Sequence, residues 1–187
     1  MSIRLREHIE KIVALTDDEF EHVLSHFTIK KFKKHQFLIQ EGENVTSDFF
    51  VIEGLVKASH TDTSGKQHIM QFAMEDWWTS DYQAYFNQTV ATLTLDCIED
   101  TEVLCLTLQN REKLCADLHK IEHFFRKKSN AGYIALQQRI LSLLNSSAKE
   151  RYEQLLVQYP SLFQRVPKTL LASYLGVSRE TLSRLSS

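Results

Sequence analysis

The middle of the chain carries seven short runs of β-forming residues, and their spacing of about ten residues most constrains the fold. The runs are rich in Phe, Val, Ile and Thr, and no proline falls among them. They cover residues 27–32, 37–40, 49–52, 55–60, 68–73, 90–98 and 103–108. Many short strands separated by turn residues are typical of a β-barrel or a jelly roll. The sequence therefore predicts a β-rich domain over this region.

Helical patterns lie on both sides of the β region. Residues 1–26 place two groups of apolar side chains at helical spacing. Thr16–Glu19, between the groups, has the pattern of a capping box, in which the Thr hydroxyl and the Glu carboxylate bind free backbone amides. Residues 110–144 again follow a helical period. We therefore predict an α+β chain, with two short helices before the β-domain and one long helix after it.

The apolar stripe of the long helix allows two interpretations. Lys128 and Gln138 interrupt a strict heptad pattern, so the helix could pack on its own β-domain. Ala131 and Gly132 leave room for a second helix to approach closely, and we favour a two-fold dimer through the helix Leu118–Leu144. This divides the chain into a β-domain with N-terminal helices, a dimerisation helix and a C-terminal domain, at residues 1–117, 118–144 and 145–187.

The C-terminal segment contains the most specific motif, a helix-turn-helix pattern over Leu170–Leu185. Ala172 is small where two helices would touch, and Gly176 can take the left-handed conformation that a tight turn needs. Ser178 can cap the second helix, and Pro167 suits the first turn of the first helix. The expected internal face is apolar and consists of Leu171, Leu175, Val177, Leu182 and Leu185.

Polar side chains would lie on the outer face of the second helix. With Leu182 and Leu185 turned inward, the helical period turns Glu180, Ser183 and Arg184 outward. An Arg guanidinium matches O6 and N7 of guanine, and a Glu carboxylate can accept from the cytosine amino group. We therefore predict DNA-binding residues at Arg179, Glu180, Arg184, Ser183, Ser178 and Lys168. A helical hairpin with a solvated polar face is the alternative.

The charge distribution agrees with a nucleic-acid partner for this end of the chain. The formal net charge is −2, but residues 145–187 hold six basic and three acidic side chains, which leaves −5 for the remainder. The start of the chain has no apolar leader and no stretch is long enough to span a membrane, so we expect a cytoplasmic protein without a membrane partner. Cys97, Cys105 and Cys115 lie in apolar stretches, which indicates buried free thiols.

Segments from both halves of the chain point to one known family. Val177–Arg184 resembles the recognition helix of the cyclic-AMP receptor/Fnr (Crp/Fnr) family of transcription regulators. Phe50–Lys57, Thr63–Gln67 and Ile98–Leu106 resemble strands and a turn of the cyclic-nucleotide-binding-like barrel of that family. The resemblance covers nearly the whole chain, and within the family the sequence most resembles the short Bacteroidetes-type branch.

The resemblance implies a function and a set of partners. Arg179, Glu180 and Arg184 stand where the family reads a palindromic half-site in double-stranded DNA. A homodimer and RNA polymerase are the protein partners that it implies. Because the chain ends at Ser187 without a wing, phosphate contacts are expected from Lys168, with Arg165, Ser173 and a helix N-terminus.

The chain departs from the family at the ligand-binding cassette. Cyclic-nucleotide sensors of this type carry Gly-Glu-x-Ala/Ser, followed about ten residues later by Arg-Thr/Ser-Ala, in which the Arg pairs with the cyclic phosphate. Here Ser80 and Asp81 stand at Gly-Glu, and Ala91 and Thr92 stand at Arg-Thr. Because alanine cannot neutralise a phosphate, we expect no cofactor and no binding of cyclic AMP by the usual mode. Asp81 is then interpreted as a solvated loop residue.

The segment Phe72–Phe86 is unusually aromatic for the place where a ligand would lie. Trp78 and Tyr82 either fill the vacated pocket as core, which we favour slightly, or line an apolar pocket for a less anionic effector. The effector-pocket candidates are Ser80, Asp81, Ala91, Thr92, Trp78 and Tyr82. Among the eight histidines we single out His119 and His123, at metal-ligand spacing, and interpret them as a solvated helix face, so no metal site is predicted.

Two functions follow from these patterns. The first is a dimeric DNA-binding regulator whose sensor domain has lost or exchanged its nucleotide. The alternative is a module that senses a cyclic nucleotide or another small molecule and acts through protein partners. We do not expect an enzyme, because the sequence has no Gly-rich phosphate loop, nucleophile elbow or paired acid and base in a recognisable context.

Overall fold

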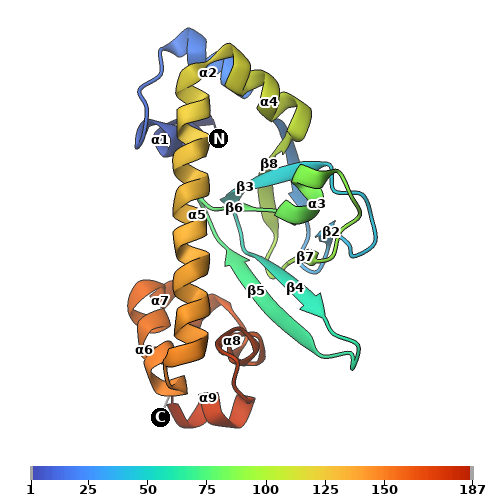
Figure 1. Ribbon diagram of the computed structural model, residues 1–187, viewed down its shortest axis with the longest axis vertical. Helices are drawn as coiled ribbons and strands as arrows, with labels where there is room; N and C mark the ends of the chain where they lie inside the picture. Colours follow the sequence, from blue (N-terminus) through green and yellow to red (C-terminus); the bar gives the residue numbers. More distant parts are fainter. Residues whose placement is uncertain (1, 186–187) are drawn as a thin grey trace. The chain divides into compact units, whose positions relative to one another are not determined.

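The computed structural model describes residues 2–185 and has the α+β architecture that the sequence predicts (Figure 1). The helices are α1 (Ser2–Glu10), α2 (Asp17–Leu24), α3 (Tyr82–Asn87), α4 (Leu108–Asp117), α5 (His119–Asn145), α6 (Ala148–Gln158), α7 (Pro160–Arg165), α8 (Lys168–Leu175) and α9 (Arg179–Leu185). The strands are β1 (Thr28–Phe32), β2 (Phe37–Ile39), β3 (Ser47–Glu53), β4 (Val56–Thr61), β5 (Gln67–Ala73), β6 (Trp78–Thr79), β7 (Thr94–Cys97) and β8 (Thr101–Thr107).

The chain divides into two compact units. The sandwich unit comprises residues 2–60 and 71–129, and the C-terminal unit comprises residues 61–70 and 130–185. The boundary falls within α5, and the end of the β4–β5 hairpin belongs to the C-terminal unit. Within the described residues, no helix combines the length and the apolar character that crossing a membrane would require.

The strands form two four-stranded sheets, in the orders β1-β8-β3-β6 and β2-β7-β4-β5. Alternation along β3 decides which side chains face which core. Phe49 and Val51 join the core that residues of both sheets share, whereas Phe50 and Ile52 join a second core with the helices. Because the strand is covered on both faces, its apolar residues are continuous rather than alternating with polar ones.

The second core lies between one sheet and the helices of the sandwich unit. It unites Leu5 of α1, Phe20 of α2, Leu114 of α4 and Phe124 of α5 with side chains of β3 and β8. The two N-terminal helices and the capping box between them are confirmed. These helices are held in place by burial of their apolar faces on the sheet.

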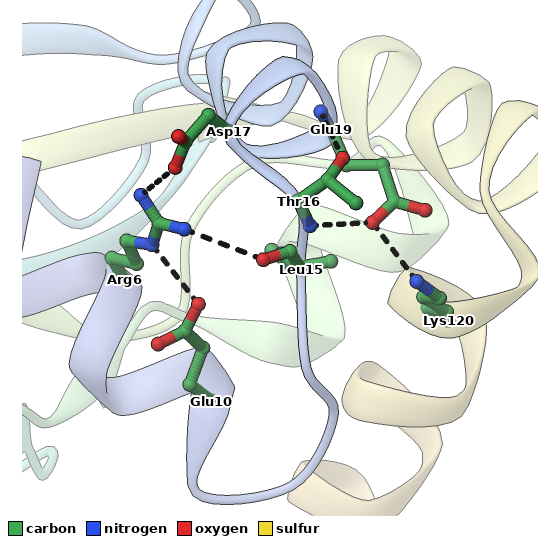
Figure 2. Close-up of polar contacts among 7 residues, drawn as sticks. All are labelled: Arg6, Glu10, Leu15, Thr16, Asp17, Glu19 and Lys120. Atoms are coloured by element: carbon green, nitrogen blue, oxygen red, sulfur yellow. Dashed lines mark hydrogen bonds and ion pairs between the residues drawn. The ribbon is translucent and has the colours of Figure 1, made fainter.

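The capping box also connects α2 to α5, as Figure 2 shows. The backbone N of Thr16 donates to Oε2 of Glu19 (2.8 Å), and the backbone N of Glu19 donates to Oγ1 of Thr16 (3.2 Å). The same Oε2 accepts from Nζ of Lys120, in the first turn of α5, at 2.9 Å. On the other side of the loop, Nη1 of Arg6 reaches Oδ1 of Asp17 at 2.7 Å.

The prediction of one helix over residues 110–144 is wrong at one position. The chain is extended at Leu118 (φ −131°, ψ 101°), and this residue separates α4 from α5. Leu118 is half-buried against the second core, and this tertiary packing accounts for the break in the helix. The helical spacing of the apolar residues gave no signal of it. The sequence also missed β6 and α3, which lie in the aromatic segment.

The cysteines lie in the sandwich unit. Cys97 and Cys105 are buried, as predicted, and Cys115 is half-buried. Burial raises the pKa of Cys105 to about 11, so its thiol stays protonated near neutral pH. Such thiols act as small apolar core residues.

Candidate DNA-reading helix and effector site

The helix-turn-helix motif has the local geometry that the sequence predicts. Gly176 ends α8 in the left-handed conformation (φ 68°, ψ 35°), where a residue with a Cβ would be strained. Oγ of Ser178 accepts from the backbone N of Thr181 at 3.1 Å and so caps α9. Ala172 and Leu182 are buried between the helices at 3% and 2% exposure. The turn and the cap therefore fix the direction in which α9 leaves α8.

The outer face of α9 presents the predicted DNA-binding side chains. Arg179, Glu180, Ser183 and Arg184 are all exposed, and Lys168 is exposed at the first position of α8. The backbone N of Glu180 lowers the pKa of its own carboxyl group, which is therefore ionised near neutral pH. Two guanidinium groups and one carboxylate thus lie on a single exposed helical face, with Leu182 on the opposite side.

Ser173 does not take the role expected from the sequence. Its Oγ donates to the carbonyl oxygen of Gln67 (2.9 Å) and accepts from the backbone N of Ile69 (3.3 Å). Both partners belong to the end of the β4–β5 hairpin within the C-terminal unit. The expectation of a phosphate contact from Ser173 is therefore wrong, because the hydroxyl group serves to attach α8 to the hairpin.

Asp81 is the centre of the effector-site candidates, and it is buried rather than solvated. Its side chain accepts four hydrogen bonds, from N of Ala84 (3.1 Å), N and Oγ1 of Thr92 (2.7 and 3.0 Å) and N of Leu93 (3.0 Å). Burial acts to raise the pKa of Asp81, but these donors outweigh it and lower the pKa. The interpretation of Asp81 as a solvated loop residue is therefore wrong.

Two other candidates, Ala91 and Ser80, lie near the carboxylate of Asp81 and are uncharged. Ala91 is 3% exposed and belongs to the core shared by the two sheets. Its backbone N donates to the carbonyl oxygen of Glu43 at 2.8 Å. Oγ of Ser80 donates to the carbonyl oxygen of Ser47 at 2.9 Å. The structure thus brings Ser80, Asp81, Ala91 and Thr92 together, with the one carboxylate as their only charged group.

The two aromatic candidates, Trp78 and Tyr82, have contacts of their own. Trp78 packs against the second core, where the space that it bounds with Phe27, Phe124 and Phe125 admits no water molecule. Its Nε1 donates to Nε2 of His8 at 3.3 Å. The core-filling interpretation of Trp78 agrees with this packing. Tyr82 is 37% exposed and stacks on Phe86, at 6.1 Å between ring centroids.

A buried polar group beside Tyr82 was missed by sequence reasoning. The hydroxyl group of Tyr82 donates to Oδ1 of Asp48 (3.3 Å), and Nη1 of Arg111 lies 3.4 Å from Oδ2 of the same carboxylate. Burial raises the pKa of Asp48 to about 7, although the charge of Arg111 opposes this rise. Asp48 lies within an apolar strand and Arg111 within an ordinary helix, so nothing local marks them as partners.

Sequence reasoning also missed a second histidine pair at the spacing of His119 and His123. His22 in α2 and His26 in the turn after this helix are four residues apart, and Asp117 lies beside them. The spacing alone was a readable signal, whereas the third side chain comes from α4.

Residues 29–117 match the family model of the cyclic nucleotide-binding domain. The chain is 22% identical, over 187 residues, to the anaerobic regulatory protein of Bacillus subtilis (strain 168), with 91% of this chain and 76% of that protein covered.

Solved structures share the fold of the chain. FixK2 from Bradyrhizobium japonicum superposes with a TM-score of 0.74 at 18% identity, covering 86% of this chain and 82% of that one. A regulator assigned to the Crp/Fnr family, from Eubacterium rectale, gives a TM-score of 0.68 at 13% identity and covers 91% and 82% of the two chains. This chain, with its sandwich, long helix and C-terminal helices, therefore has a fold similar to that of both structures.

Proposed function

We propose that this chain, a transcription regulator of the Crp/Fnr type with a cyclic-nucleotide-binding-like domain, reads double-stranded DNA as a homodimer. The observation that carries the proposal is the exposed face of α9, with Arg179, Glu180 and Arg184 on a helix whose inner face is buried. We assign it no catalytic activity. We further propose contact with RNA polymerase and a place in the short Bacteroidetes-type branch, both on the resemblance of the sequence to the family.

The chemistry of α9 supports base reading rather than simple solvation. An Arg guanidinium can donate two parallel hydrogen bonds to guanine, and the carboxylate of Glu180 can accept from cytosine. Lys168, at the start of α8, is suited to a phosphate because a lysine ammonium acts as a point charge. Ser178 caps α9, and Ser183 lies on its exposed face. The roles of all six candidates remain part of the proposal.

The second half of α5 supports a dimer. Apolar side chains of this half are exposed at a spacing that places them along one side of the helix. They are Tyr133 (71%), Ile134 (53%), Leu136 (57%), Ile140 (57%), Leu141 (48%), Leu143 (44%) and Leu144 (74%). A second copy of α5 would cover this stripe, and the open space around the Cα of Gly132 permits a close approach. Two recognition helices related by a two-fold axis match a palindromic operator.

The environment of Asp81 supports a sensor that does not take cyclic AMP by the usual cassette. Donors from Ala84, Thr92 and Leu93 all bind the internal carboxylate. A bound phosphate would have to compete with that negative charge, and Ala91 supplies no guanidinium to offset the repulsion. The proposed regulator therefore responds to a different signal or has no nucleotide effector.

DNA selection tests the proposal directly. Genomic fragments retained by the full chain, with and without cell extract, define an operator and its dependence on a small molecule. Fluorescence anisotropy then compares operator with random DNA for the parent, Arg179→Ala and Lys149→Ala. Lys149 is the matched control, because it is an exposed basic residue of α6 in the same unit.

We expect Arg179→Ala to weaken operator binding by about 5- to 150-fold, the range that corresponds to 1–3 kcal/mol for a bidentate base contact. Lys149→Ala should bind the operator as the parent does. If Arg179→Ala and Arg184→Ala also bind as the parent does, the polar face is solvated. The C-terminal helices would then be a surface for protein partners, which is the alternative function.

A further inference from the structure

The sandwich unit contains a cluster of metal-ligating side chains that the proposed DNA and effector sites do not use. One ring nitrogen of His22, one of His26 and one carboxylate oxygen of Asp117 all lie within 4.8 Å of one another. Among the described residues, this is the only group of three or more such side chains at that distance. We propose that it binds a first-row divalent transition metal, with Zn²⁺ as the ion that it fits best.

The distances suit a common metal ion after a small movement of two side chains. Nε2 of His22 lies 3.1 Å from Oδ2 of Asp117, so without a metal this nitrogen donates to the carboxylate, and a bound ion would take the place of that proton. Two ligands of a tetrahedral zinc ion lie roughly 3.4 Å apart, given bonds of about 2.0–2.2 Å. The side chains of His22 and Asp117 are each 40% exposed, so they can rotate to bring the third ligand to the same distance. Two imidazoles and one carboxylate leave a fourth position for water.

The hydrogen bonds of His26 prepare its ring for a metal. Nδ1 of His26 lies 3.0 Å from the carbonyl oxygen of His22, and a carbonyl oxygen can only accept. In the tautomer that donates from Nδ1 to this oxygen, with Oγ of Ser25 as a second neighbour of Nδ1 at 3.3 Å, Nε2 keeps a lone pair for a metal. Oγ of Ser25 donates to the same carbonyl oxygen at 2.7 Å. A ligating histidine typically donates its other N–H to a backbone carbonyl in this way, which fixes the tautomer and the ring orientation.

The other histidine pair at the same spacing has a different environment. Nδ1 of His123 accepts from Nη2 of Arg126 at 2.8 Å, and this guanidinium would repel a cation. His119 is 94% exposed at its side chain and lies 3.9 Å from a carboxylate oxygen of Glu122. Both pairs thus share the spacing of four residues, but only the pair of His22 and His26 has a third ligand beside it and a carbonyl oxygen that orients a ring.

A metal at this place would join elements that are far apart in the sequence. His22 lies near the end of α2, His26 lies in the turn that follows α2, and Asp117 is the last residue of α4, directly before the break at Leu118. The metal would therefore hold the end of α2 and the turn after it to the end of α4, on the helical side of the second core. Because the unfolded chain does not hold these three ligands together, binding adds to the folding stability of the sandwich unit.

The test is zinc binding by the full, metal-stripped chain. Isothermal titration calorimetry measures the affinity and the stoichiometry, thermal unfolding with and without Zn²⁺ measures the stabilisation, and the visible spectrum with Co²⁺ reports the coordination geometry. The variants are His22→Ala, Asp117→Asn and the matched control His119→Ala. Circular dichroism without metal establishes that each variant is folded.

We expect one zinc ion per chain, a higher melting temperature with Zn²⁺ and a tetrahedral Co²⁺ spectrum for the parent and for His119→Ala. His22→Ala and Asp117→Asn should each lose more than about tenfold in zinc affinity, and they should lose the Co²⁺ absorption. Should His22→Ala fail to fold, Asp117→Asn carries the test alone. Parent-like zinc affinity in a folded His22→Ala or Asp117→Asn would overturn the proposal, as would the absence of zinc binding by the parent.

Discussion

The guanidinium group of Arg139 lies 3.6 Å from the ring centroid of Tyr174 and donates to the carbonyl oxygen of that residue at 3.0 Å. The same nitrogen donates to the carbonyl oxygen of Ile69 at 3.1 Å. One side chain of α5 therefore contacts both α8 and the end of the β4–β5 hairpin within the C-terminal unit. Ser173 makes the second connection between α8 and the same hairpin, through Gln67.

Replacing Arg139 should loosen the hairpin from the C-terminal unit. Arg139→Lys keeps the charge but loses the planar fork, so one ammonium cannot reproduce the stacking on Tyr174 together with both carbonyl contacts. We expect a loss of about 1–3 kcal/mol in the free energy of unfolding of this unit. Hydrogen exchange should show reduced protection of residues 61–70. Unchanged protection in that segment would mean that Ser173 alone holds the hairpin.

Substitutions on the proposed DNA-reading surface, which consists of the outer face of α9 and Lys168, should have two different kinds of effect. Arg184→Ala should weaken operator binding and leave non-specific binding largely intact, because a base contact carries sequence information. Lys168→Ala, as a phosphate contact, should weaken binding to operator and random DNA alike and reduce the slope of log K against log [salt] by about one unit. Anisotropy titrations at several salt concentrations measure both effects. Equal losses of specificity in the two variants would contradict the assigned roles.

A charge in the exposed stripe of α5 should separate the proposed dimer. In Ile134→Asp, a carboxylate would have to be buried against the apolar stripe of the second copy, which strongly opposes association. Light scattering at micromolar concentration should therefore give a dimer for the parent and a monomer for the variant. The control is Val157→Asp, because Val157 on α6 is exposed at 85% and lies outside the stripe. A monomeric parent would remove the dimer from the proposal.

Asp81 should support the fold rather than bind a ligand. Asp81→Ala leaves the amides of Ala84, Thr92 and Leu93 without their acceptor, and we expect a loss of about 3 kcal/mol in the free energy of unfolding. Asp81→Asn, which keeps one oxygen acceptor, should lose less. Chemical denaturation measures both variants. Calorimetry should detect no micromolar binding of cyclic AMP to the parent, and saturable binding there would show that the alignment of the cassette is wrong.

The buried imidazole of His8 should make the sandwich unit sensitive to acid. Burial lowers the pKa of His8 to about 4, from 6.5 in the unfolded chain, and the charge of Lys128 adds to this shift. Between these two values the unfolded chain binds a proton that the folded chain does not, so stability falls as the pH falls from 6.5 to 4.

Denaturation at several pH values should isolate this contribution. His8→Phe should lose less stability than the parent over that interval, and the exposed His119→Phe should follow the parent. His8→Phe also leaves Nε1 of Trp78 without its acceptor, and this lowers the free energy of unfolding by a similar amount at each pH. An identical pH profile in parent and His8→Phe would mean that His8 has the same pKa in the folded and the unfolded chain, and this would contradict the prediction.

Local patterns were enough to predict the helix-turn-helix motif and most of the elements, although not β6, α3 or the break at Leu118. The turn at Gly176, the cap at Ser178 and the inward Leu182 depend on residues within a few positions of one another, and all three have the predicted geometry. The capping box at Thr16 and the β runs follow the same rule. Backbone conformation and side-chain period are set by near neighbours in the chain, so they can be read without knowledge of the tertiary structure.

Partners from distant segments were decided only by the tertiary structure. Arg111 meets Asp48 across 63 positions, and Ser173 meets Gln67 across 106. Asp81 is a buried acceptor because packing brings Thr92 and Leu93 to it, and Asp117 lies beside His22 and His26 because α4 ends there. Such pairs depend on strand register and on which helix face is buried, and these result from the packing of the whole domain rather than from any local pattern.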